Sequence, residues 1–202
     1  MVSTVTNPDR FFGEEVPQDI RLSALVVLLA GVANMTGALA LVWASWETIR
    51  RGGGAVTVQY AVSIAVGVGN VFVSWMLYAA SFYALSAFFD GDGSFRRVVT
   101  YVAWGFVPTA LAGLLRGGVI TRRAAGAEFP DAPSELGPFV QQLTAGPMFD
   151  MLAFVGIVCT VWSGFLWLFA VKHARDVSVR GAALTVVGPI TVSIGMRLLG
   201  YL

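Results

Sequence analysis

Charged residues and cysteine are scarce in this chain of 202 residues. Asp, Glu, Lys and Arg together make up 12% of it, about half of their share in an ordinary soluble domain. The net charge of +1 gives no basic surface that could hold nucleic acid, so we expect no nucleic-acid partner. Cys159 is the single cysteine and excludes a disulfide within the chain.

Residue combinations that catalyse reactions or hold metals are also missing. His173 is the only histidine, and it follows Lys172. Residues 90–93 (Asp-Gly-Asp-Gly) are similar to the start of a calcium-binding loop, but its twelfth position is Tyr101 instead of the required Glu, so we expect a turn. We therefore predict no catalytic residue, no metal site, no cofactor and no enzyme activity.

Long apolar runs are abundant instead, since 56% of the residues are hydrophobic. A helix needs about 20 mostly apolar residues to cross the hydrocarbon core. Five segments qualify, with approximate bounds 22–46, 60–89, 98–115, 151–171 and 181–202. They lack the alternation of barrel strands, so the sequence predicts an all-α polytopic membrane protein, a bundle of five transmembrane helices. A short polar segment (1–21) precedes this membrane domain (22–202), which contains one long loop (116–150).

Two prolines fall within the predicted spans, and we expect helix kinks at Pro108 and Pro189. The distribution of Lys and Arg gives the orientation, because these residues favour the cytoplasmic side. Seven lie on the side of the N-terminus and six on the other. This bias favours a cell-membrane protein with a cytoplasmic N-terminus and a C-terminus outside.

Uncharged polar residues within the spans are the candidates for a site. Asn34, Ser63 and Asn70 lie on the first two predicted helices and could line a polar cavity. Further polar positions within the spans are Ser74, Ser81, Ser163, Thr185 and Ser193. Hydrogen bonding between packed helices is the alternative interpretation, and the residues leave both open.

Two further patterns concern partners. Arg96, Arg97, Lys172, Arg175 and Arg180 would form a basic ring at one membrane face and could contact anionic lipid headgroups, although charges that only set topology would give the same pattern. Small residues recur every four positions at 61, 65 and 69 and again at 156, 160 and 164. This spacing suits close helix packing within the chain, or a homo-oligomer or contact with another membrane protein.

Several of these stretches together resemble a known family. The quoted stretches are residues 7–12 (Asn-Pro-Asp-Arg-Phe-Phe), 93–101 (Gly-Ser-Phe-Arg-Arg-Val-Val-Thr-Tyr), Val107-Pro108, 162–167 (Trp-Ser-Gly-Phe-Leu-Trp), 172–175 (Lys-His-Ala-Arg) and Pro189. The chain is similar to the Yip family, membrane proteins named for interaction with Ypt/Rab GTPases, and resembles its prokaryotic members over residues 7–200. The resemblance implies a five-helix bundle with a cytoplasmic N-terminus.

The same resemblance frames the expected function. Eukaryotic members carry an Asp-Leu-Tyr-Gly-Pro-type motif in a longer N-terminal region, where this chain has Val16-Pro17-Gln18-Asp19. This departure argues against GTPase binding. We expect a non-enzymatic Yip-family protein that organises membrane or recruits partners. The alternatives are a small channel or transporter, built around Asn34, Ser63 and Asn70, and an enzyme acting on lipid, for which His173, Asp176 and Asp90 would have to converge.

Overall fold

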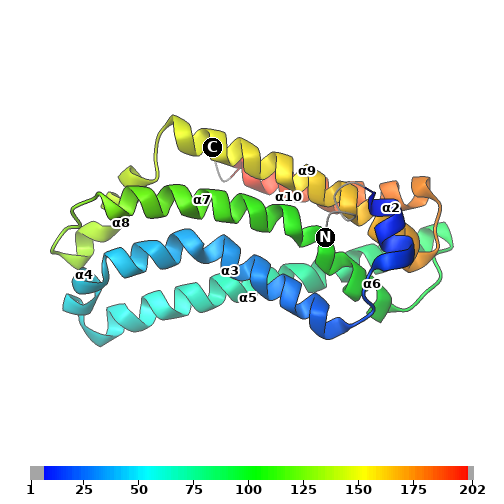
Figure 1. The fold of residues 1–202 in the computed structure, drawn as a ribbon, viewed down its shortest axis with the longest axis horizontal. Helices are drawn as coiled ribbons and strands as arrows, with labels where there is room; N and C mark the ends of the chain where they lie inside the picture. Colours follow the sequence, from blue (N-terminus) through cyan, green and yellow to red (C-terminus); the bar gives the residue numbers. More distant parts are fainter. Residues whose placement is uncertain (1–6, 200–202) are drawn as a thin grey trace.

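The computed structural model describes residues 7–199. Its secondary structure in that range consists of helices joined by turns, with no strand (Figure 1). Five helical segments are long and apolar enough to cross a membrane. They are α3 (Ile20–Ala44), α5 (Gly53–Ser86) with its extension η2 (Ala87–Phe89), the run α6 to α7 (Phe95–Ala125), α9 (Pro147–Arg175) and α10 (Val179–Leu199). The predicted all-α fold with five spans is confirmed. Positions 200–202 of the predicted fifth span lie outside the described residues.

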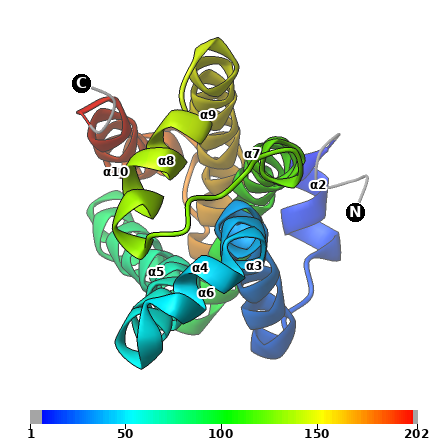
Figure 2. The ribbon, with the colours of Figure 1, turned by 90° about the vertical axis from the view of Figure 1, so that its left-hand side faces the viewer.

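Shorter elements lie at the two ends of the bundle (Figures 1 and 2). At one end, the Arg175 pole, residues 7–21, 87–97 and 172–180 meet. At the other, the α8 pole, lie residues 45–58 and 122–147. The short elements are α2 (Pro8–Arg10), η1 (Phe11–Glu15), α4 (Trp46–Arg51), η4 (Pro133–Glu135) and α8 (Leu136–Leu143). Helix α8 crosses the end of the bundle (Figure 2).

The N-terminal segment packs against the bundle. The side chain of Asn7 caps α2 by accepting a hydrogen bond from the Arg10 amide. Phe11 and Phe12 in the next turn are buried, with the Phe11 ring 5.2 Å from Trp104. The predicted polar segment 1–21 therefore supplies core residues, while its positions 1–6 lie outside the described residues.

The third span is longer than predicted and is interrupted. The chain is α-helical over α6 (Phe95–Val102), forms a 3₁₀ turn over η3 (Ala103–Phe106) and continues as α7 (Val107–Ala125). Pro108 lies in the first turn of α7. Backbone N–H groups there have no partner within the helix, so the missing N–H of proline costs no hydrogen bond. Positions 116–125 of the predicted loop are helical because arginine ends an apolar run without disfavouring a helix. Pro189 lies inside α10.

The backbones of helices α3 and α7 approach each other closely where α7 carries glycines. A Cβ atom at Gly113 would meet the backbone of Asn34, and one at Gly117 would overlap Thr36. These glycines allow the two backbones to approach. The small residues at 61, 65 and 69 predicted a close helix contact on that face of α5. A Cβ added at Gly69, however, meets nothing within 4 Å. Small residues therefore pack α7 on α3, whereas the face of α5 around Gly69 is uncovered.

Helix α5 contacts the bundle unevenly along its length. Its buried residues are Trp75, Ala79, Phe82 and Ser86, all in the half nearer the Arg175 pole. The half nearer the α8 pole carries exposed side chains such as Val62 and Val66. This half of α5 packs loosely against α9 and α10, and a hollow remains between them.

Candidate functional site

The hollow is a polar cavity of about 500 Å³ walled by α3, α5, α9 and α10, with Phe106 and Thr109 at the start of α7. A volume of this size falls within the range of small-molecule sites. We call it the Asn70 cavity. Its polar lining residues are Asn34, Asn70, Ser74, Tyr78, Thr109, Thr160, Ser163 and Ser193. Asn70 and Met196 on opposite walls are exposed, so the cavity opens between α5 and α10.

Two of the three predicted cavity residues meet in this space. Asn34 and Asn70 both line the Asn70 cavity, from α3 and α5 respectively. Ser63 lies instead in a second cavity of about 290 Å³ that Leu136 and Val140 of α8 cover. We call this second space the Ser63 cavity. The structure thus brings Asn34 and Asn70 together and sets Ser63 apart.

A single stripe along α5 connects the two cavities. Its members follow one another at intervals of three or four residues, which places them on one helix face. They are Ser63, Gly67, Asn70, Ser74 and Tyr78. At 1.5 Å per residue the stripe runs for roughly 22 Å along the helix. Periodicity on α5 was the sequence signal that could have identified Ser74 and Tyr78 as partners of Asn70.

Aromatic rings close the Asn70 cavity toward the Arg175 pole. The rings of Tyr78 and Trp167 lie 4.4 Å apart, and Phe106 and Phe82 pack against Trp167 at 5.4 and 5.6 Å. The Trp167 indole donates a hydrogen bond to the Val102 carbonyl at 2.7 Å. Gly105 makes room for this ring, since a Cβ there would overlap the indole. The buried aromatic cluster forms a fixed floor.

One flexible side chain separates the two cavities. Met35 lines both of them, and a Cβ atom at Gly67 would overlap its sulfur. The Met35 thioether therefore lies against the bare backbone of α5 at Gly67. Methionine is unbranched and changes rotamer readily. A rotation of Met35 would join the Ser63 cavity to the Asn70 cavity.

Several polar groups in the Asn70 cavity have unused hydrogen-bonding capacity. The Asn34 amide donates to the Ala30 carbonyl at 2.8 Å, and Tyr78 and Ser193 share a hydrogen bond between their hydroxyls. Ser163 is fully buried, and its hydroxyl has no partner among the described residues. A buried polar group without a partner costs about 1–3 kcal/mol. Ordered water or ligand satisfies most such groups in native proteins.

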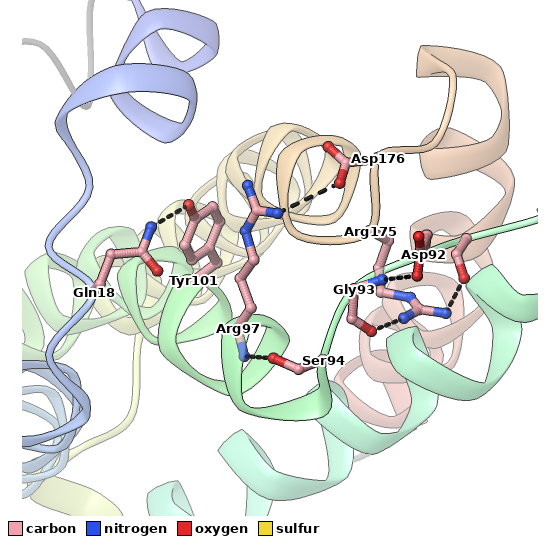
Figure 3. A network of polar contacts seen from close by, with 9 residues as sticks. Gln18, Asp92, Gly93, Ser94, Arg97, Tyr101, Arg175 and Asp176 are labelled. Carbon is pink, nitrogen blue, oxygen red and sulfur yellow. Dashed lines mark hydrogen bonds and ion pairs between the residues drawn. The ribbon is translucent and has the colours of Figure 1, made fainter.

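The polar network at the Arg175 pole differs, because every nitrogen of its central cation donates a hydrogen bond (Figure 3). The Arg175 guanidinium donates to the Ser86 hydroxyl at 2.9 Å and to the carbonyls of Gly91 and Gly93. It also lies 4.4 Å from the centre of the Tyr83 ring. These contacts hold the turn at residues 90–93 as a structural element, in agreement with its interpretation as a turn.

The predicted basic ring does not form as expected. Arg175 is 4% exposed and points inward, so it is not available to a lipid headgroup, and including it in the ring was wrong. Arg97 pairs with Asp176 and Lys172 with Asp9. Arg96 and Arg180 have no ion pair in the described part of the chain. Headgroup contact stays a prediction for Arg96, Arg97, Lys172 and Arg180. Residues 7–21, 90–97 and 172–180 carry seven basic and seven acidic side chains, which leaves this pole neutral.

A second ionic contact fastens the N-terminal segment to α9. Asp9 lies 2.5 Å from the Lys172 amine and 2.6 Å from the His173 ring nitrogen. Hydrogen bonds from Lys172 and His173 lower the pKa of the Asp9 carboxyl below its ordinary value. Because Asp9 engages His173, the hypothetical convergence of His173, Asp176 and Asp90 for lipid chemistry has no support. Within residues 7–199, no group of three His, Cys, Asp or Glu residues could hold a metal ion.

Comparison with known sequences identifies the family. The sequence profile of the Yip1 domain matches residues 2–199, nearly the whole chain. The chain belongs to the Yip1 domain family. A relative of this Yip1 protein is an uncharacterised protein, MJ0794, of the archaeon Methanocaldococcus jannaschii, 25% identical over 120 residues that span 57% of this chain and 84% of the relative. No solved structure matches. The resemblance to prokaryotic Yip proteins is thus confirmed, as is a multi-pass membrane protein.

Proposed function

We propose that this Yip1 protein is a small, non-enzymatic transporter whose substrate-binding site is the Asn70 cavity. The observation that carries the proposal is the Asn70 amide, which is exposed in the wall of a polar cavity and has no hydrogen-bond partner among residues 7–199. A polar group inside a membrane bundle is costly unless something pairs with it. A substrate, or the water that it displaces, supplies that partner.

The shape of the cavity supports the same proposal. Alternating access requires a site that is closed on one side while it opens on the other. The floor of Tyr78 and Trp167 closes the Asn70 cavity toward the Arg175 pole, and Met35 lies between it and the Ser63 cavity at the α8 pole. In the proposed carrier, rotation of Met35 gives the site access from the α8 pole.

Water access tests the proposal directly. On a Cys159→Ala background, we expect Asn70→Cys to react with a membrane-impermeant maleimide from the α8 pole alone. Glu128→Cys, at an exposed position of that pole, should react from the same side. Val73→Cys is the matched control, because Val73 lies on the lipid-facing side of the same helix and should not react. Intact cells and inverted vesicles separate the two sides. They also test the proposed orientation in the cell membrane, with a cytoplasmic N-terminus and an external C-terminus. An Asn70→Cys thiol that is inert from both sides would mean a dry cavity and would remove the proposal.

Membrane organisation through a partner is the second candidate function. It is favoured by the uncovered face of α5, where Gly69 has open space beside the exposed Val66 and Val73. Small residues on a lipid-facing helix allow a second helix, from another copy or another membrane protein, to approach closely. Oxidative cross-linking of Gly69→Cys in native membranes should give a discrete adduct if this face binds a partner. A thiol that stays monomeric would argue for lipid contact alone.

A further inference from the structure

The hydrogen-bonding groups that remain free in the Asn70 cavity define what it can bind, if the proposed transport function holds. Thr109 and Thr160 donate their hydroxyl protons to carbonyls of their own helices at 2.9 Å, to Phe106 and Gly156 respectively. Only their lone pairs are left for a ligand. The Asn34 side chain likewise keeps its carbonyl oxygen and one N–H after donating to Ala30.

The Asn70 amide supplies free donors, because it is exposed and has no hydrogen-bond partner in residues 7–199. The Ser163 hydroxyl also has no partner in that range, but it is fully buried behind the cavity wall. An amide offers two N–H donors and one carbonyl acceptor, and a hydroxyl offers one donor and two lone pairs. The cavity therefore presents unsatisfied donors and unsatisfied acceptors together, on side chains from four helices, α3, α5, α7 and α9.

Formal charge is absent from the described part of the lining. None of the described residues that line the cavity is Asp, Glu, Lys, Arg or His. An ion that entered would lose its hydration shell without gaining a counter-charge, and the cost of such burial is several kcal/mol. A cation would also need a shell of oxygen ligands, whereas the backbone carbonyls of α3, α5 and α9 are engaged in helical hydrogen bonds. The lining thus disfavours ions of both signs.

The floor adds an apolar surface to these polar groups. The one polar atom of Trp167 is bonded to Val102, so the ring offers only its carbon surface to the cavity. We infer that the Asn70 cavity binds a small uncharged molecule or headgroup whose hydroxyl or amide groups both donate and accept hydrogen bonds, with its C–H surface against Trp167 and Tyr78. A free polyol and the neutral sugar headgroup of a glycolipid share this chemistry.

Purified protein in sealed vesicles separates these sources. We would measure vesicle swelling driven by glycerol or acetamide, leakage of potassium chloride and sodium acetate, and transbilayer movement of a fluorescent galactosyl diacylglycerol. Each probe would be run with the wild type, with Asn70→Leu combined with Ser163→Ala, and with Ser81→Ala. Ser81 is the matched control, a serine of α5 outside the Asn70 cavity.

We expect glycerol and acetamide to enter several-fold faster with the wild type and with Ser81→Ala than with protein-free vesicles. The double variant should lose this gain, and potassium and acetate should not respond. Movement of the glycolipid alone, lost in the double variant, would assign the same chemistry to a headgroup. If the wild type carries ions and the double variant does not, the inference that the ligand is uncharged would be overturned. The transport proposal would still stand. No response to any probe would overturn the inference, and labelling of Asn70→Cys then decides separately whether the transport proposal survives.

Discussion

The Arg175 pole and the Asn70 cavity both place polar groups inside a membrane protein, but those groups are paired at the pole and partly unpaired in the cavity. At the pole, all three nitrogens of a buried guanidinium donate hydrogen bonds to the turn at residues 90–93 or to Ser86. In the cavity, Ser163 has no partner among the described residues. Saturated networks hold a fold together, whereas unsaturated ones are available to ligands. The predictions below test this difference, beginning with the largest effect.

Loss of the saturated cation should have the greatest effect. Arg175→Met leaves the Gly91 and Gly93 carbonyls without their donors, and removal of one member of a buried charged network costs about 3–5 kcal/mol. We expect the melting temperature to fall by roughly 6–20 °C. Arg180→Met is the control, since Arg180 is exposed at the same pole. Equal melting temperatures for the two variants would mean that Arg175 has no structural role.

A smaller loss should follow from separating α3 and α7. Gly117→Ala places a methyl group against Thr36, and overpacking of this kind costs about 1–3 kcal/mol. Its neighbour Gly118 has open space, so Gly118→Ala should be neutral or slightly stabilising. Denaturation in mild detergent measures both. If the two alanine variants unfold alike, the close approach of α3 and α7 does not exist.

Substitution of a cavity residue should not lower the stability of the protein, in contrast to the two changes above. Asn70→Leu removes an unsatisfied amide from the membrane interior, so stability should be unchanged or higher by up to about 1 kcal/mol, while ligand binding is lost. The same denaturation assay, together with the vesicle measurements, reports both quantities. A strongly destabilised Asn70→Leu variant would mean that Asn70 is part of the structural framework, as Arg175 is.

The contact of Asp9 with α9 should give the smallest effect and a distinct pH dependence. Because the pKa of Asp9 is lowered in the folded protein, its contribution is present above the ordinary value of 3.8 and is lost as the pH falls below that value. Hydrogen exchange at the Phe11 and Phe12 amides should rise as the pH falls through this window, after correction for intrinsic rates. In Asp9→Asn it should be elevated already at neutral pH, with no further change. Glu14→Gln, which alters only an exposed pair, should behave as the wild type.

Length and hydropathy predicted the five membrane helices because the bilayer imposes both. The predicted loop at 116–150 was partly wrong because charge ends a hydrophobic run without ending a helix, and α7 continues to Ala125. Ser94 caps α6 by accepting a hydrogen bond from the Arg97 amide, and serine is a residue type that favours this position.

The site was only partly predictable from sequence. Asn34 and Asn70 were identifiable as intramembrane polar residues, but hydropathy does not show which helix faces which. Ser63 lies on the same face of α5 as Asn70, about two turns away, and enters a different cavity because Met35 intervenes. Arg175 looked like a surface cation among basic neighbours. The Arg175 side chain points inward because it donates hydrogen bonds to the turn between α5 and α6. This is a tertiary contact that the sequence does not show.

The most direct test of this account is a crystal structure grown from a lipid mesophase, with attention to the space between Asn70 and Ser163. The account predicts ordered density that belongs to water or a ligand and lies within hydrogen-bonding distance of the Asn70 amide. A bundle in which α5 and α10 close together, with Ser163 bonded to a protein group and no cavity beside Asn70, would contradict it.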